Sequence, residues 1–217
     1  MKKKIIIPAH RPIIKICGLT RPDNALACVH AGADVIGLVF FDKSPRNVTI
    51  DQAIAITNIL PSAVLTCGVF VDASFEFIME RVERCRLTAV QLHGQESPTL
   101  VERLAKQNLR VIKALFAAKK PNLADASRYT AAWFCLVEYG RGTLPGGNAE
   151  SWDYGLLTGL ATQVPLMLAG GLSCENIEQA ICLANPSAVD VSSGVEKAHG
   201  LKDIEKVTAF IRKARPA

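Results

Sequence analysis

Apolar segments of strand length alternate with helical patterns along almost the whole chain, with little sequence between them. The strand-like segments, rich in Val, Ile and Leu, occupy residues 13–17, 34–40, 63–70, 89–93, 110–116, 133–138, 164–169 and 188–191. The helical patterns follow them at residues 23–31, 49–60, 74–84, 97–107, 122–129, 151–160, 173–183 and 203–214. Strands and helices that alternate in this way build parallel sheets, and eight such units in about 200–250 residues match a closed barrel. The pattern predicts an α/β fold, a single (β/α)8 barrel.

An open, doubly wound sheet is the main alternative for such alternation, and it usually carries a G-x-G-x-x-G turn for a dinucleotide. The nearest segment, residues 140–145, lacks the third glycine. The sequence also has no Walker loop, no HExxH motif and no cluster of Cys and His. We therefore expect one TIM barrel over residues 12–217, preceded by an N-terminal extension at residues 1–11.

The charge of the chain limits its partners. The formal net charge is +5, and Lys2, Lys3 and Lys4 supply three of the positive charges. The remaining basic residues are interspersed with acidic ones, so no basic stripe of the kind that binds nucleic acid is present. We expect no nucleic-acid partner, and the mild positive excess favours a small anionic ligand.

The cysteines and the N-terminus bear on location. The chain has seven cysteines and no CxxC pair, and several of them lie within apolar runs, which is typical of reduced thiols in a cytoplasmic protein. The apolar run at residues 5–7 is ended by Pro8 and is too short for a signal sequence or a membrane span. We expect a cytoplasmic protein with no membrane partner.

Reactive side chains stand at or just after the ends of the predicted strands. Cys17 ends the first, Arg46 follows the second, His93 ends the fourth, Glu138 ends the sixth and Asp190 lies in the eighth. The carboxyl ends of barrel strands meet at one mouth, where barrel enzymes have their active sites. Thiol, imidazole and carboxyl groups transfer protons, and a guanidinium binds carboxylate or phosphate.

Two of these candidates have simpler explanations. An isolated arginine is usually a surface residue, although Pro45 restricts the loop before Arg46 and favours a fixed side chain. His93, like Asp72 at the end of the third strand, has an even chance of being a satisfied polar residue.

Glycine-rich loops follow the last two predicted strands. The seventh is followed by Gly170 and Gly171, and the eighth by Ser193 and Gly194. These two loops are the usual phosphate site of this fold, where backbone N–H groups bind the anion. The alternative is that the glycines only form turns, but two such loops in both expected places favour phosphate binding.

Several of these segments resemble one family, the phosphoribosylanthranilate isomerases of tryptophan biosynthesis. The resemblance rests on the motifs KICGLT at 15–20, SPR at 44–46, QLHG at 91–94, LAGGL at 168–172 and DVSSGVE at 190–196. They occur in the family's order and extend from about residue 13 to the C-terminus.

The resemblance implies an Amadori rearrangement of N-(5'-phosphoribosyl)anthranilate without cofactor or metal, by a monomer or homodimer. It implies Cys17 as general base and an acid at the end of the sixth strand. Arg46 would hold the anthranilate carboxylate, and Asp190 would lie near the reacting amine or ribose. The two glycine-rich loops would hold the phosphate. Lys15, two residues before Cys17 on the same strand face, is a candidate for lowering the pKa of the thiol.

The chain departs from the family pattern after the sixth strand. Glu138 stands where the family has an aspartate, and the loop at residues 140–149 is altered, with Trp152-Asp153-Tyr154 where Phe-Asp-Trp is usual. A glutamate can donate a proton just as an aspartate can, but the glutamate carboxyl lies one methylene further from the backbone. We expect Glu138 to be the acid, and the loop is a candidate lid.

Two other functions remain open. One is a neighbouring phosphate-binding barrel enzyme, such as an indoleglycerol-phosphate synthase or an aminoaldose isomerase of histidine biosynthesis. Those enzymes use lysine or aspartate pairs at the mouth, and a thiol at the end of the first strand argues against them. The other is a sugar-phosphate-binding barrel with impaired catalysis, which the glutamate suggests.

Overall fold

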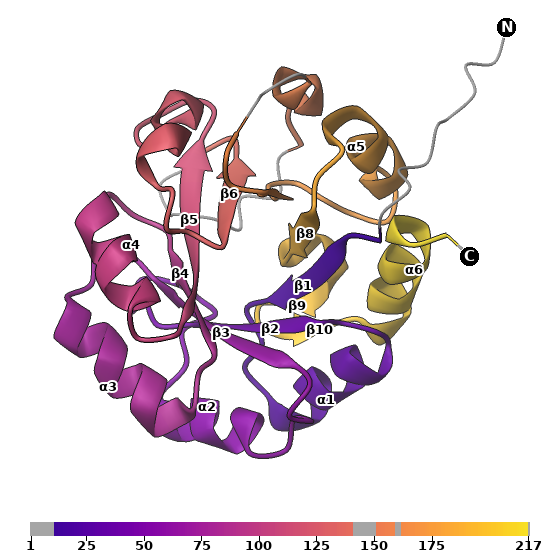
Figure 1. Cartoon of the computed structure of the whole chain (residues 1–217). Helices are drawn as coiled ribbons and strands as arrows, with labels where there is room; N and C mark the ends of the chain where they lie inside the picture. The colour runs from indigo at the N-terminus through magenta and orange to yellow at the C-terminus, as the bar shows by residue number, and fades with distance from the viewer. Residues whose placement is uncertain (1–10, 141–150, 159–161, 217) are drawn as a thin grey trace, which may run out of the picture.

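The strands of a computed structural model, which describes residues 11–140, 151–158 and 162–216, form a closed parallel barrel. Figure 1 shows the strands at the centre and the helices around the outside. Each strand pairs with the next in chain order, and β1 closes the barrel by pairing with β8. The strands are β1 (Ile13–Cys17), β2 (Val35–Val39), β3 (Leu65–Phe70), β4 (Ala89–Leu92), β5 (Arg110–Phe116), β6 (Phe134–Glu138), β7 (Leu166–Leu168) and β8 (Ala188–Val191). The predicted (β/α)8 barrel is confirmed.

Most of the α-helices in the described ranges begin at a residue whose side chain caps the first turn. The α-helices are α1 (Pro22–His30), α2 (Ile50–Thr57), α3 (Phe75–Cys85), α4 (Pro98–Ala105), α5 (Ile177–Ala184) and α6 (Ile204–Ala214). The side chains of Thr49, Ser74, Ser97 and Asp203 accept hydrogen bonds from backbone N–H groups in the first turns of α2, α3, α4 and α6. Such caps satisfy donors that the helix itself leaves unpaired.

Two of the predicted helical segments are 3-10 helices in the structure. The segment predicted at 122–129 is a 3-10 helix, η1 (Leu123–Arg128), and the described part of the segment predicted at 151–160 contains only the 3-10 helix η2 (Tyr154–Leu157). Two aromatic side chains in the second segment bond to backbone carbonyls after β7 instead of lying along a helix face. Tertiary contacts thus override a weak local helical preference there.

The described residues cover only part of the predicted domain limits. The barrel begins with β1 at Ile13, and residues 1–10 of the predicted extension lie outside the described residues. Residues 141–149 of the candidate lid also lie outside them. In the described ranges, no helix is both long enough and apolar enough to span a membrane.

Alternate residues of each strand point into the barrel, because successive side chains of a strand point to opposite faces. The inner cluster consists mainly of apolar side chains: Val35, Cys67, Ala89, Ile112, Ala114, Phe116, Phe134, Leu136, Met167, Ala169 and Ala188. Polar residues of the same inward registers lie nearer the carboxyl ends of the strands. The lower barrel is therefore a packed core, as in other barrels of this kind.

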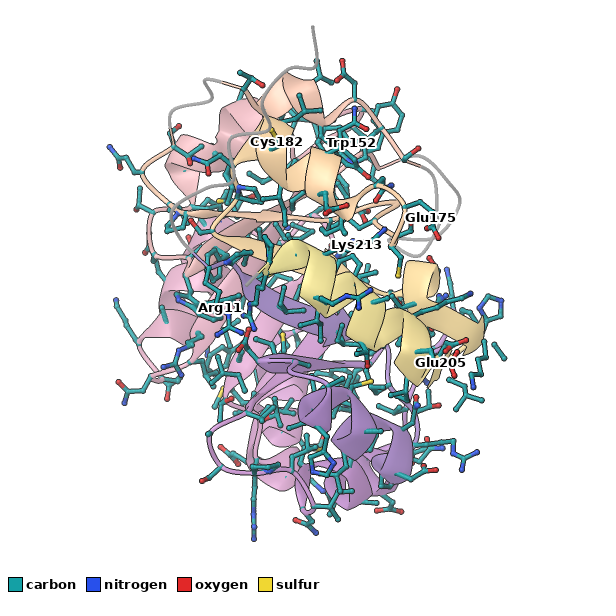
Figure 2. The ribbon with its side chains drawn as sticks, turned by 90° about the vertical axis from the view of Figure 1, so that its right-hand side faces the viewer. Arg11, Trp152, Glu175, Cys182, Glu205 and Lys213 are labelled. Atoms are coloured by element: carbon teal, nitrogen blue, oxygen red, sulfur yellow. The ribbon has the colours of Figure 1, made fainter. Side chains whose placement is uncertain are left out.

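A small hairpin is added after β8. It follows the 3-10 helix η3 (Ser193–Val195) and consists of β9 (Glu196–Ala198) and β10 (Leu201–Lys202), which pair antiparallel. The chain then enters α6, which is joined to the loop after β7, because Lys213 donates to the carbonyl of Cys174 at 2.7 Å. Figure 2 shows Lys213 on α6 beside the segment that carries Glu175.

Candidate active site

Four of the predicted site residues belong to the inward registers of their strands, three at the upper rim and Asp190 one layer below it. Cys17 ends β1, His93 follows β4, Glu138 ends β6 and Asp190 lies in β8. Cys17, His93 and Glu138 are each less than a tenth exposed. Since β1 and β6 are separated around the barrel by β7 and β8, the thiol and the Glu138 carboxyl approach the mouth from different sides.

The Cys17 thiol lies over a strand position that has no side chain. Cys17 pairs in register with Gly37 of β2, and a Cβ atom built on Gly37 would lie 2.8 Å from Cys17 Sγ. Burial raises the pKa of the thiol above its ordinary value, and the nearby Lys15 ammonium acts in the opposite direction. The net shift is upward, so Lys15 moderates the effect of burial without reversing it.

Lys15 and Asp190 form a buried ion pair directly below the thiol. Lys15 Nζ donates to Asp190 Oδ1 at 2.8 Å, and the lysine side chain is fully buried. Burial by itself lowers the pKa of Lys15, but the Asp190 carboxylate, together with the neighbouring Cys17 and Cys67, raises it by more. Lys15 therefore remains an ammonium, and Asp190, predicted to lie near the substrate, has its Oδ1 atom engaged by this lysine.

Glu138 belongs to a chain of side-chain hydrogen bonds across the inner face. His93 Nε2 lies 3.2 Å from Glu138 Oε1, and Gln91 Nε2 lies 2.7 Å from His93 Nδ1. When the Gln91 amide donates to Nδ1, a neutral imidazole carries its proton on Nε2 and donates it to Glu138. His93 therefore holds the carboxyl of Glu138 in place.

Arg46 reaches the rim from the loop after β2 and is held by the hairpin after β8. Its Nε and Nη2 atoms donate to Glu196 Oε1 and Oε2 at 2.9 and 2.7 Å. Its side chain is only 8% exposed, so it is not the surface arginine that the sequence left open. The hydrogen bonds to Glu196 raise the pKa of Arg46.

The two glycine-rich loops pack against each other. A Cβ on Gly194 would overlap the carbonyl oxygen of Leu172, so the loops after β7 and β8 meet backbone to backbone. Gly170 and Gly171 have φ angles of 81° and 65°, a left-handed conformation that other residues rarely adopt. Both loops therefore lie together where barrels of this kind bind phosphate.

Trp152 and Tyr154 orient the loop after β7. Trp152 Nε1 donates to the carbonyl of Ala169 at 3.0 Å, and Tyr154 Oη donates to the carbonyl of Gly170 at 2.9 Å. Both aromatic side chains are buried. By engaging these carbonyls, they fix the peptide planes of the loop after β7.

Sequence reasoning missed the partners that hold the site together. Lys15 was identified only as a neighbour of Cys17, and the roles of Gln91, Glu196 and Lys202 were not identified. Asp72, which had an even chance of being only a satisfied polar residue, is exposed, and its carboxylate accepts a hydrogen bond from the backbone N–H of Gln95 at 2.6 Å. The sequence offered one signal for two of these residues, because Gln91 belongs to the QLHG motif and Glu196 to the DVSSGVE motif.

The described residues contain no group of three or more His, Cys, Asp and Glu side chains arranged to hold a metal ion. What they bring to the mouth is a thiol, a carboxyl in contact with an imidazole, and an arginine, together with two adjoining glycine-rich loops. A parallel barrel with this rim belongs to the class of barrel enzymes that move protons on a small anionic substrate.

Comparison with known proteins identifies the family within that class. A family model described as N-(5'phosphoribosyl)anthranilate (PRA) isomerase matches residues 14–213. An N-(5'-phosphoribosyl)anthranilate isomerase from Desulfatibacillum aliphaticivorans is 50% identical over 201 residues, which cover 93% of this chain and 92% of the relative. The chain belongs to the N-(5'-phosphoribosyl)anthranilate isomerase family.

Solved structures agree with this assignment. The crystal structure of phosphoribosyl anthranilate isomerase from Thermotoga maritima matches with a TM-score of 0.86 at 36% identity, covering 94% of this chain and 98% of that chain. A crystal structure of such an isomerase in complex with reduced 1-(o-carboxyphenylamino)-1-deoxyribulose 5-phosphate matches with a TM-score of 0.83 at 35% identity and the same coverage.

Proposed function

We propose that the chain converts N-(5'-phosphoribosyl)anthranilate to 1-(2-carboxyphenylamino)-1-deoxyribulose 5-phosphate, with Glu138 as general acid and Cys17 as general base. Family membership over residues 14–213 supports the reaction. The observation that carries the assignment of roles is that Cys17 and Glu138 end β1 and β6 at one rim of the closed barrel, in inward registers. A proton donor and a proton acceptor thus approach one bound sugar from different sides.

The reaction needs one proton delivered and one removed. Glu138 gives its proton to the ribose ring oxygen as the bond between that oxygen and C1' breaks, and the nitrogen lone pair forms an iminium. The iminium acidifies the proton on C2', and the Cys17 thiolate removes it to leave an enolamine. The enolamine tautomerises to the ketone, so no atoms are lost and no external oxidant is required. Acid and base groups of this kind each contribute about 10²–10⁴-fold in rate.

The raised pKa of Cys17 has two opposing effects on this chemistry. Burial leaves less thiolate at neutral pH, but the thiolate that forms is a stronger base. Positive charge next to the sulfur favours ionisation, and Lys15 supplies part of it. The substrate iminium adds a second positive charge at the moment when the base is needed.

The remaining site residues bind the substrate in this proposal. Arg46 holds the anthranilate carboxylate, and Gly170, Gly171, Ser193 and Gly194 hold the phosphate through backbone N–H groups. The crystal structure of a relative with a bound phosphorylated product analogue supports a substrate of this kind.

Location and assembly are also proposals. We place the enzyme in the cytoplasm, which suits the free state of all seven cysteines. We propose that it works as a monomer or a homodimer, and one related structure concerns monomers made from a dimeric isomerase of Thermotoga maritima.

The test follows the loss of anthranilate fluorescence from freshly made phosphoribosylanthranilate. We expect turnover by the wild type and a loss of about 10²–10⁴-fold in kcat for Cys17→Ser and for Glu138→Gln. Cys28→Ala is the control, because that thiol is buried on α1 outside the barrel and its loss should leave kcat near wild type. No turnover by pure wild type, where a known isomerase works, would refute the function, and near-full turnover by Glu138→Gln would exclude Glu138 as the acid.

A further inference from the structure

The guanidinium of Arg46 has one edge engaged and one edge available. Nε and Nη2 donate to the two oxygens of Glu196, and Nη2 also lies 3.3 Å from His199 Nδ1. Nη1 has no hydrogen-bond partner among the residues that the structure describes. The bidentate pair therefore fixes the plane of the guanidinium and leaves the Nη1 end for a ligand.

Pairing with Glu196 creates an electrostatic problem for anion binding. A guanidinium and a carboxylate in contact cancel each other's charge, and a neutral pair attracts a substrate carboxylate weakly. Glu196 stays ionised in the fold: burial favours its neutral form, but Arg46 and Lys202 outweigh burial and lower its pKa to about 2. A further cation is therefore needed if Arg46 is to bind an anion.

Lys202 supplies that cation. Its Nζ donates to Glu196 Oε1 at 2.7 Å, to the Ser192 carbonyl at 3.2 Å and to Ser192 Oγ at 3.4 Å. Three acceptors match the three N–H groups of an ammonium. Burial lowers the pKa of Lys202, and the Glu196 carboxylate offsets only part of that shift, but the 2.7 Å contact with an ionised Glu196 favours the ammonium form. Two cations and one anion leave the cluster with a single positive charge.

The hairpin that carries Glu196 and Lys202 is anchored in the fold. The backbone N–H of Lys202 donates to Asn24 Oδ1 at 2.7 Å, and Asn24 Nδ2 donates back to the Lys202 carbonyl at 3.0 Å. Asn24 lies in α1, so the hairpin is fixed to the first helix. Glu196 and Lys202 thus hold their positions independently of the arginine they surround.

The same cluster adjoins the proposed base. The stem of Arg46 passes over Gly18, the residue after Cys17, where a Cβ would lie 2.5 Å from Arg46 Cδ. Ser192 Oγ, an acceptor of Lys202, donates to the carbonyl of Cys17 at 3.0 Å. The charge that the cluster retains is therefore presented close to Cys17.

We propose that Glu196 and Lys202 are positioning residues that determine specificity: Glu196 aims Arg46 at the aromatic carboxylate of the substrate, and Lys202 restores the charge that Glu196 cancels. The inference rests on the proposed function, in which Arg46 binds that carboxylate. Loss of either residue weakens recognition of the carboxylate. Loss of Lys202 also removes a positive charge near Cys17, and that effect acts equally on a substrate with or without the carboxylate.

The test compares two substrates, N-(5'-phosphoribosyl)anthranilate and N-(5'-phosphoribosyl)aniline, which lacks the carboxylate. Conversion of each is followed by chromatography, and the ratio of the two kcat/KM values measures recognition of the carboxylate. We expect Lys202→Met, which leaves the charge of Arg46 cancelled, to lower kcat/KM for the anthranilate about 10–100-fold, the range for a hydrogen bond to a charged group. Glu196→Gln should lower it as well, because an amide offers Arg46 only one of the two acceptor oxygens and no longer fixes the guanidinium plane, and this loss outweighs the gain in positive charge. The value for the aniline should change by less than about threefold in Glu196→Gln, and in Lys202→Met it should fall less than the value for the anthranilate.

Asp34→Asn is the matched control. Asp34 is paired with Arg215, ahead of β2 at the opposite end of the barrel. This variant removes the carboxylate partner of an arginine and should lower stability without changing the substrate ratio. Glu196→Gln nearly preserves the shape of the side chain, so it keeps the test usable if Lys202→Met does not fold.

The possible results distinguish failure of the specificity role of Glu196 and Lys202 from failure of the proposed function. Equal losses on both substrates in the two variants would overturn the specificity role and leave only a structural one. A wild type that converts both substrates equally well would overturn it too, because Arg46 would then not recognise the carboxylate. A wild type that converts neither substrate would refute the proposed function itself.

Discussion

Replacing Gly37 with alanine tests whether the position of the Cys17 sulfur controls the reaction. The new Cβ would lie 2.8 Å from Cys17 Sγ and 3.0 Å from Cys17 Cα. Ordinary contacts between such atoms are about 3.5–4.0 Å, so the sulfur must move by about 0.7–1.2 Å. Because a backbone atom is also too close, rotation of the thiol alone does not relieve the contact.

A displacement of about 1 Å at a reacting group costs about 10²-fold in rate, which corresponds to about 2.7 kcal/mol in the barrier. We therefore expect Gly37→Ala to lower kcat about 100-fold in the anthranilate fluorescence assay, with KM changed little. Overpacking also costs about 1–3 kcal/mol of stability, which urea unfolding measures. The variant should remain folded under assay conditions.

Two comparisons isolate the cause. Gly68→Ala places a Cβ 2.7 Å from side-chain atoms of Leu87 and Phe70, so it overpacks the neighbouring strand β3 away from the thiol. It should lose stability but keep kcat within about threefold of wild type. In a Cys17→Ser background, Gly37→Ala should cause little further loss in kcat, because the effects of substitutions at residues that act as a unit are not additive. A folded Gly37→Ala with near wild-type kcat would refute the claim that Gly37 sets the position of the base.

Three further outcomes follow from the same structure. Because burial raises the pKa of Cys17, kcat/KM should increase with pH on the alkaline side, and a pH profile that does not change in Cys17→Ser would contradict this. Glu196 has a pKa of about 2 in the fold against 4.5 otherwise, so its ionised form contributes about 3 kcal/mol to the free energy of unfolding above pH 4.5. Urea unfolding should show that contribution lost as pH falls toward 2, and Glu196→Gln should show less of this decline. Trp152→Phe removes the donor to the Ala169 carbonyl, so KM should rise about 2–10-fold at constant kcat, and an unchanged KM would count against the phosphate-loop role.

Local signals in the sequence were enough for the architecture. Strand and helix periodicities predicted the barrel, and the helices predicted to start at residues 74 and 97 are capped in the structure by Ser74 and Ser97. The same signals failed at residues 151–158, where side chains bond to a distant strand end. Local preference is weak there, so contacts from elsewhere in the chain decide the conformation.

For the proposed site, too, the sequence predicted some features and not others. The sequence alone placed Cys17, His93 and Glu138 at strand ends, because strand boundaries and the parallel order of the barrel put those ends at one rim. It could not show which charges would be engaged by one another. Lys15 meets Asp190 across 175 positions of the chain, and Arg46 meets Glu196 across 150.

Such pairs leave no periodic trace in the sequence, since they form only when β8 closes against β1 and the hairpin folds back over the mouth. The chain's own residue order therefore determined the barrel and which reactive groups line its mouth. Tertiary structure decided how those groups are aimed and charged, because electrostatic interaction depends on distance in space and burial, and neither is set by distance along the chain.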